Sequence, residues 1–184
     1  MLDQLATWLV VAMTTFVPPQ SDTDRARYES MAHDFAAVAL DNAEEPAFEG
    51  DLGRAKTALL MASIASWESG YRADVDDGRT LGDHGQSFCI MQVRVIGKTR
   101  EGWAGMDLTS DRTKCLRVAL RHIRESFRWC ASSVQEDRLA GYTVGSCRQN
   151  EHFSRDRVGR AKWFWNKSPF DQPTAPDPWP GEAR

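Results

Sequence analysis

Apolar residues recur at helical spacing along most of the chain. A first apolar run spans residues 5–17 and is stopped by the prolines at 18 and 19. Beyond Ser21, a good helix N-cap, residues Met31, Phe35 and Val38 share one face of a helix that reaches about residue 40. Similar patterns predict further helices over about 51–69, 111–128, 134–140 and 155–165.

The helical pattern is lost between about residues 71 and 95. Residues 76–78 and 82–85 are rich in turn formers, and residues 87–93 have the apolar character of a short buried strand. The sequence therefore predicts an α+β fold that is mainly α-helical, with a small β element between helices. We expect a single domain over residues 1–168, followed by an irregular tail at 169–184 that holds five prolines.

Composition and charge narrow the class of protein. Apolar residues make up 41% and charged residues 27% of the chain, as in ordinary globular proteins. The net charge of -3 argues against nucleic-acid binding, because nucleic-acid binders usually carry a basic excess. Four cysteines allow three complete pairings, which the sequence leaves open. Their even number favours an oxidising, extracytoplasmic location, although four reduced, buried thiols are an equally good interpretation.

The apolar run at 5–17 has two interpretations. It is too short to cross a bilayer as a helix, and it has neither the basic flank nor the cleavage site of a secretory signal. We favour a structural first helix within residues 1–20 that packs on the domain. The alternative is a membrane-active or anchoring segment.

The best candidate for chemistry is Glu68. It ends a strongly apolar helix, where the negative pole of the helix dipole disfavours a second negative charge. Apolar neighbours such as Trp67 would remove water from the carboxylate, and both effects raise its pKa toward that of a general acid. Taken alone, Glu68 is more simply interpreted as an ordinary exposed glutamate at a helix end.

The residues that follow Glu68 form a recognisable order of motifs. Glu68-Ser69 closes the helix, a Gly-Asp-His-Gly turn follows at 82–85, and Cys-Ile-Met-Gln lies at 89–92. A Gly-Tyr-Thr-Val-Gly stretch comes later, at 141–145. In this order the region 55–145 resembles the soluble lytic transglycosylases and goose-type lysozymes, which share the lysozyme fold. Two positions depart from the family pattern, because Cys89 replaces a glycine and Thr143 an asparagine.

The resemblance implies a lysozyme-like fold and a role for each matching residue. Glu68 is then the catalytic acid, and Met91 and Gln92 line a glycan-binding cleft. Tyr142 is expected near Glu68, where its hydroxyl could bond the carboxyl or the substrate. The remaining implied substrate-binding residues are Ser69 and Ser87.

The activity that the resemblance implies is cleavage of the MurNAc-(β1,4)-GlcNAc bond of peptidoglycan, without a cofactor. We slightly favour muramidase-type hydrolysis, in which Asp83 activates water as a second carboxylate. The alternative is a lytic transglycosylase, which needs one carboxylate because the sugar's own 6-hydroxyl closes a 1,6-anhydro ring. Goose-type enzymes often carry a second aspartate just after the Met-Gln-Val run, and this sequence has Arg94 at that position. The expected partner is the glycan strand, bound by a monomer.

Several other patterns have less specific interpretations. A wall-binding or structural protein could keep such a fold without activity. The four histidines are scattered and have no metal-ligand motif, so we expect no metal site. Three further groups are expected to be structural: a solvated arginine face at 117, 121, 124 and 128, solvated turn aspartates at 74, 76 and 77, and an aromatic packing cluster at 163–165.

Overall fold

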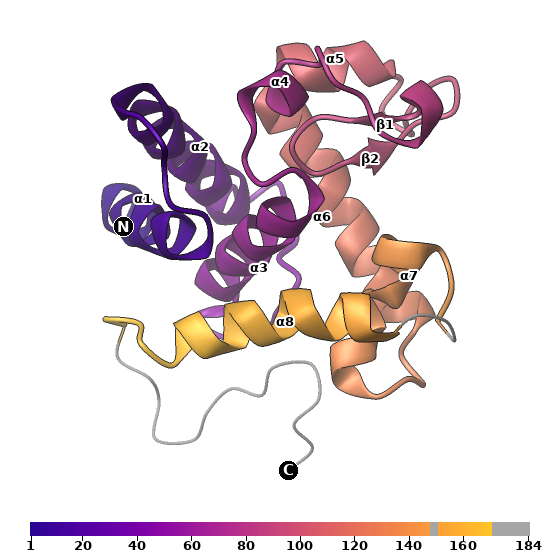
Figure 1. The fold of residues 1–184 in the computed structure, drawn as a ribbon. Coiled ribbons are helices and arrows are strands. Elements are labelled where there is room, and N and C mark those ends of the chain that lie inside the picture. The colour runs from indigo at the N-terminus through magenta and orange to yellow at the C-terminus, as the bar shows by residue number, and fades with distance from the viewer. Residues whose placement is uncertain (148–150, 171–184) are drawn as a thin grey trace.

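A computed structural model describes residues 1–147 and 151–170 of the chain (Figure 1). The longer helices are α1 (Leu2–Phe16), α2 (Asp22–Leu40), α3 (Gly53–Glu68), α6 (Arg112–Trp129) and α8 (Glu151–Trp165). The shorter elements are α4 (Ala73–Asp76), η1 (Asp83–Gly85), β1 (Ser87–Phe88), β2 (Val93–Arg94), α5 (Gly105–Ser110), η2 (Gln135–Leu139) and α7 (Ala140–Val144). The mainly helical α+β class is confirmed.

Helix α3 lies in the middle of the molecule. Thirteen of its sixteen residues are buried, because α1, α2, α6 and α8 pack around it (Figure 1). Small side chains such as Ala58, Ala62 and Ala65 alternate with large ones such as Leu59 and Met61, so neighbouring helices approach closely on every side. The three residues of α3 that are not buried are Arg54 near its start and Trp67 and Glu68 at its end.

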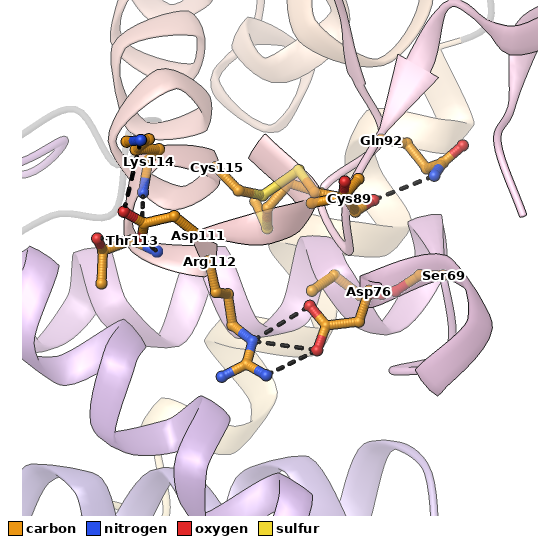
Figure 2. The surroundings of a disulfide bond; sticks show 12 residues. Ser69, Asp76, Cys89, Gln92, Asp111, Arg112, Thr113, Lys114 and Cys115 are labelled. Carbon is orange, nitrogen blue, oxygen red and sulfur yellow. Dashed lines mark hydrogen bonds and ion pairs between the residues drawn. A yellow bond between two sulfur atoms is a disulfide. The ribbon is translucent and has the colours of Figure 1, made fainter. Parts of the chain in front are cut away.

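Capping residues mark the starts of α2 and α6. The Ser21 side chain accepts a hydrogen bond from the Asp24 amide (3.1 Å) at the start of α2. Asp111 caps α6 in the same way, accepting from the amides of Thr113 (3.0 Å) and Lys114 (3.3 Å; Figure 2). Helix α6 is strongly amphipathic, and its apolar side contributes Leu116 and other residues to the core.

The β element of the fold is small. The predicted small β element is present: β1 and β2 pair antiparallel, Ser87 with Arg94 and Phe88 with Val93, and the buried residues 89–92 form the turn between them. Helix α5 has no counterpart among the predicted elements. It packs beside β1, and a β-carbon at Gly105 would lie 2.3 Å from the Phe88 ring, so only glycine allows this approach.

Two disulfides fix the parts of the chain that follow α3. Cys89 pairs with Cys115 and thereby ties the β1–β2 turn to α6 (Figure 2). Cys130 pairs with Cys147 and ties the end of α6 to the segment after α7. This selects one of the three pairings that the sequence left open, and it leaves no free cysteine.

The N-terminal segment is a structural helix. Leu5, Trp8, Leu9 and Met13 of α1 are buried in the main core, and the Trp8 ring packs edge-on against Trp165 of α8 (5.7 Å between centroids). Among the residues that the structure describes, none of the helices combines the length and apolar character required to span a bilayer.

The charged groups expected to be solvated are mostly engaged in ion pairs. Arg117 contacts Asp41 and Glu44, Arg121 contacts Glu101 and Glu125, and Arg124 contacts Glu45. Arg128 is exposed and makes no ion pair with any residue that the structure describes. Asp76 is 9% exposed and pairs with Arg112 (Figure 2).

Within the predicted aromatic cluster, Phe164 and Trp165 are buried as expected, whereas Trp163 is half exposed.

Candidate active site

Glu68 is the last residue of α3 and faces a groove. The groove has a volume of about 510 Å³ and is formed by residues from three parts of the chain, 68–94, 122 and 142–145. Its lining residues are Glu68, Gly82, Asp83, Ser87, Gln92, Val93, Arg94, His122, Tyr142, Thr143, Val144 and Gly145. Glu68 is therefore not directed into open solvent: its side chain is only 18% exposed.

Arg157 of α8 forms an ion pair with Glu68 that sequence analysis did not foresee. Its Nη2 and Nε atoms lie 2.8 and 3.0 Å from Glu68 Oε1, and its Nη1 donates to the carbonyl of Phe153 (2.6 Å). Burial raises the pKa of the Glu68 carboxyl, Arg157 lowers it by charge and hydrogen bonding, and nearby Asp83 raises it. The net direction is upward from the ordinary value of 4.5, so loss of solvent outweighs the ion pair.

Asp83 belongs to the same groove. It lies in η1 with a φ of +46°, and its Oδ2 accepts a hydrogen bond of 2.6 Å from the Ser87 hydroxyl. Asp83 and Ser87 both line the groove, as expected of substrate-facing residues. The Ser87 hydroxyl proton is already used by Asp83, so Ser87 acts first as a support for that carboxylate.

Gln92 enters the groove from the β1–β2 turn. Its side-chain amide donates to the Cys89 carbonyl (3.1 Å; Figure 2), and its Oε1 lies over Gly82. A β-carbon at Gly82 would come within 2.0 Å of that oxygen, which explains why the turn has glycine at this position. Gln92 therefore lines the groove.

Met91 and Ser69 are placed differently from the prediction. The Met91 side chain is fully buried, since the turn directs it into the core, and it does not line the groove. Ser69 is 7% exposed, and its hydroxyl donates to the Ala65 carbonyl (3.0 Å) and accepts from the Tyr71 amide (3.2 Å). Ser69 therefore ends α3 instead of facing a ligand.

Tyr142 lines the groove close enough to Glu68 for the carboxylate charge to affect it. Burial raises the pKa of Tyr142 well above its ordinary value, and the charge of Glu68 raises it further. The Tyr142 hydroxyl donates to the Met91 carbonyl (2.6 Å) and not to Glu68. Of the two expected bonds, to the carboxyl or to the substrate, the first is not formed, and the hydroxyl instead fastens α7 to the β1–β2 turn.

His122 and Arg94 line the groove, although sequence analysis assigned neither a role in the site. His122 was considered only as a metal ligand; burial lowers its pKa, which favours the neutral imidazole. Such an imidazole can donate and accept hydrogen bonds with sugar hydroxyls. Arg94 lines the groove and donates to Gln86 (3.0 Å). Over residues 1–147 and 151–170, no cluster of three or more potential metal ligands occurs.

Unusual backbone conformations concentrate in the segment that builds the groove. The described non-glycine residues with positive φ are Tyr71, Asp83, His84, Cys89 and Gln92, and all fall within 22 residues of the chain. A left-handed conformation costs a side-chain-bearing residue about 1–2 kcal/mol. Such costs persist mainly where the surroundings, or a function, require that geometry.

Comparison of the chain with protein-family models, with curated proteins and with solved structures finds no match in any of the three.

Proposed function

We propose that this protein is a peptidoglycan glycosidase that cleaves the MurNAc-(β1,4)-GlcNAc bond with Glu68 as general acid. The observation that carries the proposal is a poorly hydrated carboxyl group with a raised pKa at the wall of a large polar groove. A group of this kind can hold a proton and deliver it to a glycosidic oxygen as oxocarbenium character develops on the sugar.

The backbone of the β1–β2 turn supports the resemblance to soluble lytic transglycosylases and goose-type lysozymes. Cys89 stands where that pattern has glycine, and its φ is +60°, a value that glycine adopts freely. The position thus has the geometry that the family motif would require. The Cys89–Cys115 disulfide holds the residue in place from its side chain.

Hydrolysis assisted by Asp83 is the reaction we favour. Asp83 lines the groove with Glu68, and its charge raises the pKa of Glu68, as expected of a second carboxylate within electrostatic reach. In this mechanism Glu68 protonates the leaving oxygen while Asp83, held by Ser87, activates water. Transglycosylation would use Glu68 alone, first as acid and then as base toward the sugar's 6-hydroxyl.

A non-catalytic wall-binding protein is the second candidate, and the Arg157 ion pair favours it. A guanidinium at 2.8 Å stabilises the ionised form of Glu68, which cannot donate a proton. For catalysis, entry of the glycan must reduce the contribution of this pair. The two candidates therefore differ in whether Glu68 is protonated once the groove is filled.

Digestion of purified peptidoglycan tests the proposal. The wild-type protein should release muropeptides, and Glu68→Gln should abolish release while the fold, followed by circular dichroism, is kept. Glu29→Gln is the matched control, because Glu29 is an exposed glutamate of α2 far along the chain from the groove. Mass analysis of the products separates hydrolysis from transglycosylation, since an anhydro-terminated product would contradict the role of Asp83.

Full activity of Glu68→Gln would contradict its role as acid. Binding to walls without any cleavage by the wild type would favour the non-catalytic candidate. We also propose an extracytoplasmic site of action, because both disulfides require an oxidising environment to persist and peptidoglycan lies outside the cytoplasm.

A further inference from the structure

A cationic and aromatic surface lies directly beside the groove. Trp67 precedes Glu68 in α3 and is 43% exposed. The Arg160 guanidinium lies 4.4 Å from the centroid of the Trp67 ring, and the Arg157 guanidinium lies 5.8 Å from it. Arg157 is itself only 8% exposed and also contacts Glu68, so it links the groove wall to the more exposed Trp67 and Arg160.

The positive charge of Arg160 is incompletely compensated. Arg157 has Glu68 as its acidic partner, whereas Arg160 makes no ion pair in the described part of the chain. Its guanidinium donates to the Ser66 hydroxyl (2.7 Å) and also lies over the Phe16 ring. Burial lowers the pKa of Arg160 and the charge of Arg157 lowers it further, although Asp156 and Tyr71 act in the other direction. An arriving anion would therefore be stabilised here.

The substrate class carries a suitable anion close to the cleaved bond. The muramic acid whose anomeric carbon reacts is substituted at C3 with a lactyl group, and a peptide with free carboxylates extends from it. Arginine binds carboxylates with two parallel hydrogen bonds, and an adjacent indole supplies a flat apolar surface for the peptide. Because Trp67 and Arg160 lie next to Glu68 and its partner Arg157, a substituent that leaves the groove on this side would meet them.

We propose that Arg160 and Trp67 form a subsite for the carboxylate-bearing stem peptide of the muramyl residue whose bond is cleaved. The inference rests on the proposed function, because it takes the position of the sugar from the role of Glu68. Arg157 lies between the two sites, so a carboxylate held at Arg160 would compete with Glu68 for its charge and weaken that ion pair. The subsite thus selects glycan that carries peptide over glycan that does not.

Kinetics on two substrates test the subsite. Intact peptidoglycan is compared with glycan strands from which an amidase has removed the peptides. Arg160→Gln should raise KM on the peptide-bearing substrate by about tenfold, the usual worth of one hydrogen bond to a charged group, and leave KM on the bare strands unchanged. Arg128→Gln is the matched control: Arg128 is exposed on α6 and has no ion pair among the described residues. An equal loss on both substrates would overturn the subsite while leaving the proposed glycosidase intact.

Direct binding separates failure of the subsite from failure of the proposed function. The wild-type protein is titrated with a muramyl peptide monomer, which has no glycosidic bond to cleave, and Trp67 is followed by the NMR signal of its indole N–H. A shift of that signal, with binding about tenfold weaker for a monomer whose carboxylates are amidated, supports the subsite even if no wall is digested. Equal binding of both monomers would overturn the subsite. Binding of the protein to whole walls gives a second check: if that binding is lost when teichoic acid is removed from the walls, the anion bound is not the peptide and the subsite is overturned.

Discussion

Helix α3 and the segment 69–95 that follows it differ in what determines their structure. In α3 nearly every side chain is buried, and the backbone is a regular helix throughout. In the following segment the backbone repeatedly enters the left-handed region, and its shape is held by a disulfide and by single hydrogen bonds such as that from Ser87 to Asp83. Glu68 lies at the boundary between the two.

This difference indicates a division of roles. Burial on all sides fixes the position of α3, so the carboxyl at its end has a defined location. The segment after it supplies the groups that surround the carboxyl, at the cost of strained conformations that other parts of the molecule must hold in place. Changes in the two regions should therefore have different consequences.

The largest effect is expected from a cavity in α3. Met61→Ala removes a fully buried side chain from the helix, and we expect the free energy of unfolding to fall by about 2–5 kcal/mol. Met106→Ala, at a half-exposed position of α5, makes the same chemical change and should cost far less. Urea unfolding measures both values. Equal values would show that α3 is not the rigid support described above.

A smaller effect is expected from the backbone conformation at residue 89 in the β1–β2 turn, compared between two variants that both lack the disulfide. Removing the Cys89–Cys115 disulfide, which spans 26 residues, should cost about 3.5 kcal/mol of unfolding free energy in the chain-entropy model. The informative comparison is between two double variants, Cys89→Gly/Cys115→Ala and Cys89→Ala/Cys115→Ala. The glycine variant should be more stable by about 1 kcal/mol, because φ at residue 89 is +60°. If alanine were as good as glycine, the left-handed conformation of the turn would be contradicted.

The smallest effect concerns pH and tests the surroundings of Glu68, the residue at which α3 meets the segment 69–95. Burial raises the pKa of Glu68 and Arg157 lowers it, so Arg157→Gln should move that pKa further up. A general acid must be protonated, and the alkaline limb of the pH–rate profile should therefore shift to higher pH in this variant. Rates of peptidoglycan cleavage between pH 4 and 9 measure the shift. A limb that does not move would mean that Glu68 is not the group that limits activity.

The regular part of the fold was predictable because it depends on periodicity. The helix that ends at Glu68 follows from the run of apolar residues before it, and Ser21 marks the start of α2 as expected. Helix α5 was missed because its six residues are too few for a periodic pattern. The β element was predicted but its extent was not, since residues 89–92 are as apolar in a tight turn as they would be in a strand.

The site was predictable only in part. Glu68, Asp83, Gln92 and Tyr142 meet at one groove, as the motif order suggested. The prediction that Met91 lines the groove is wrong, because the β1–β2 turn places the Met91 side chain in the core. Arg157 could not have been found from spacing, since 89 residues separate it from Glu68 and α8 offers several arginines with no local signal to distinguish them.

Because α3 is buried over most of its length, the chain cannot gain or lose residues within this helix without moving Glu68. Adding or deleting one residue within the helix would turn everything beyond that point by about 100° and shift it by about 1.5 Å along the axis. Glu68 would then leave the groove and Trp67 or Ser69 would take its place. Natural or engineered insertions compatible with the fold should therefore lie outside 53–68, in the loops that connect the outer helices.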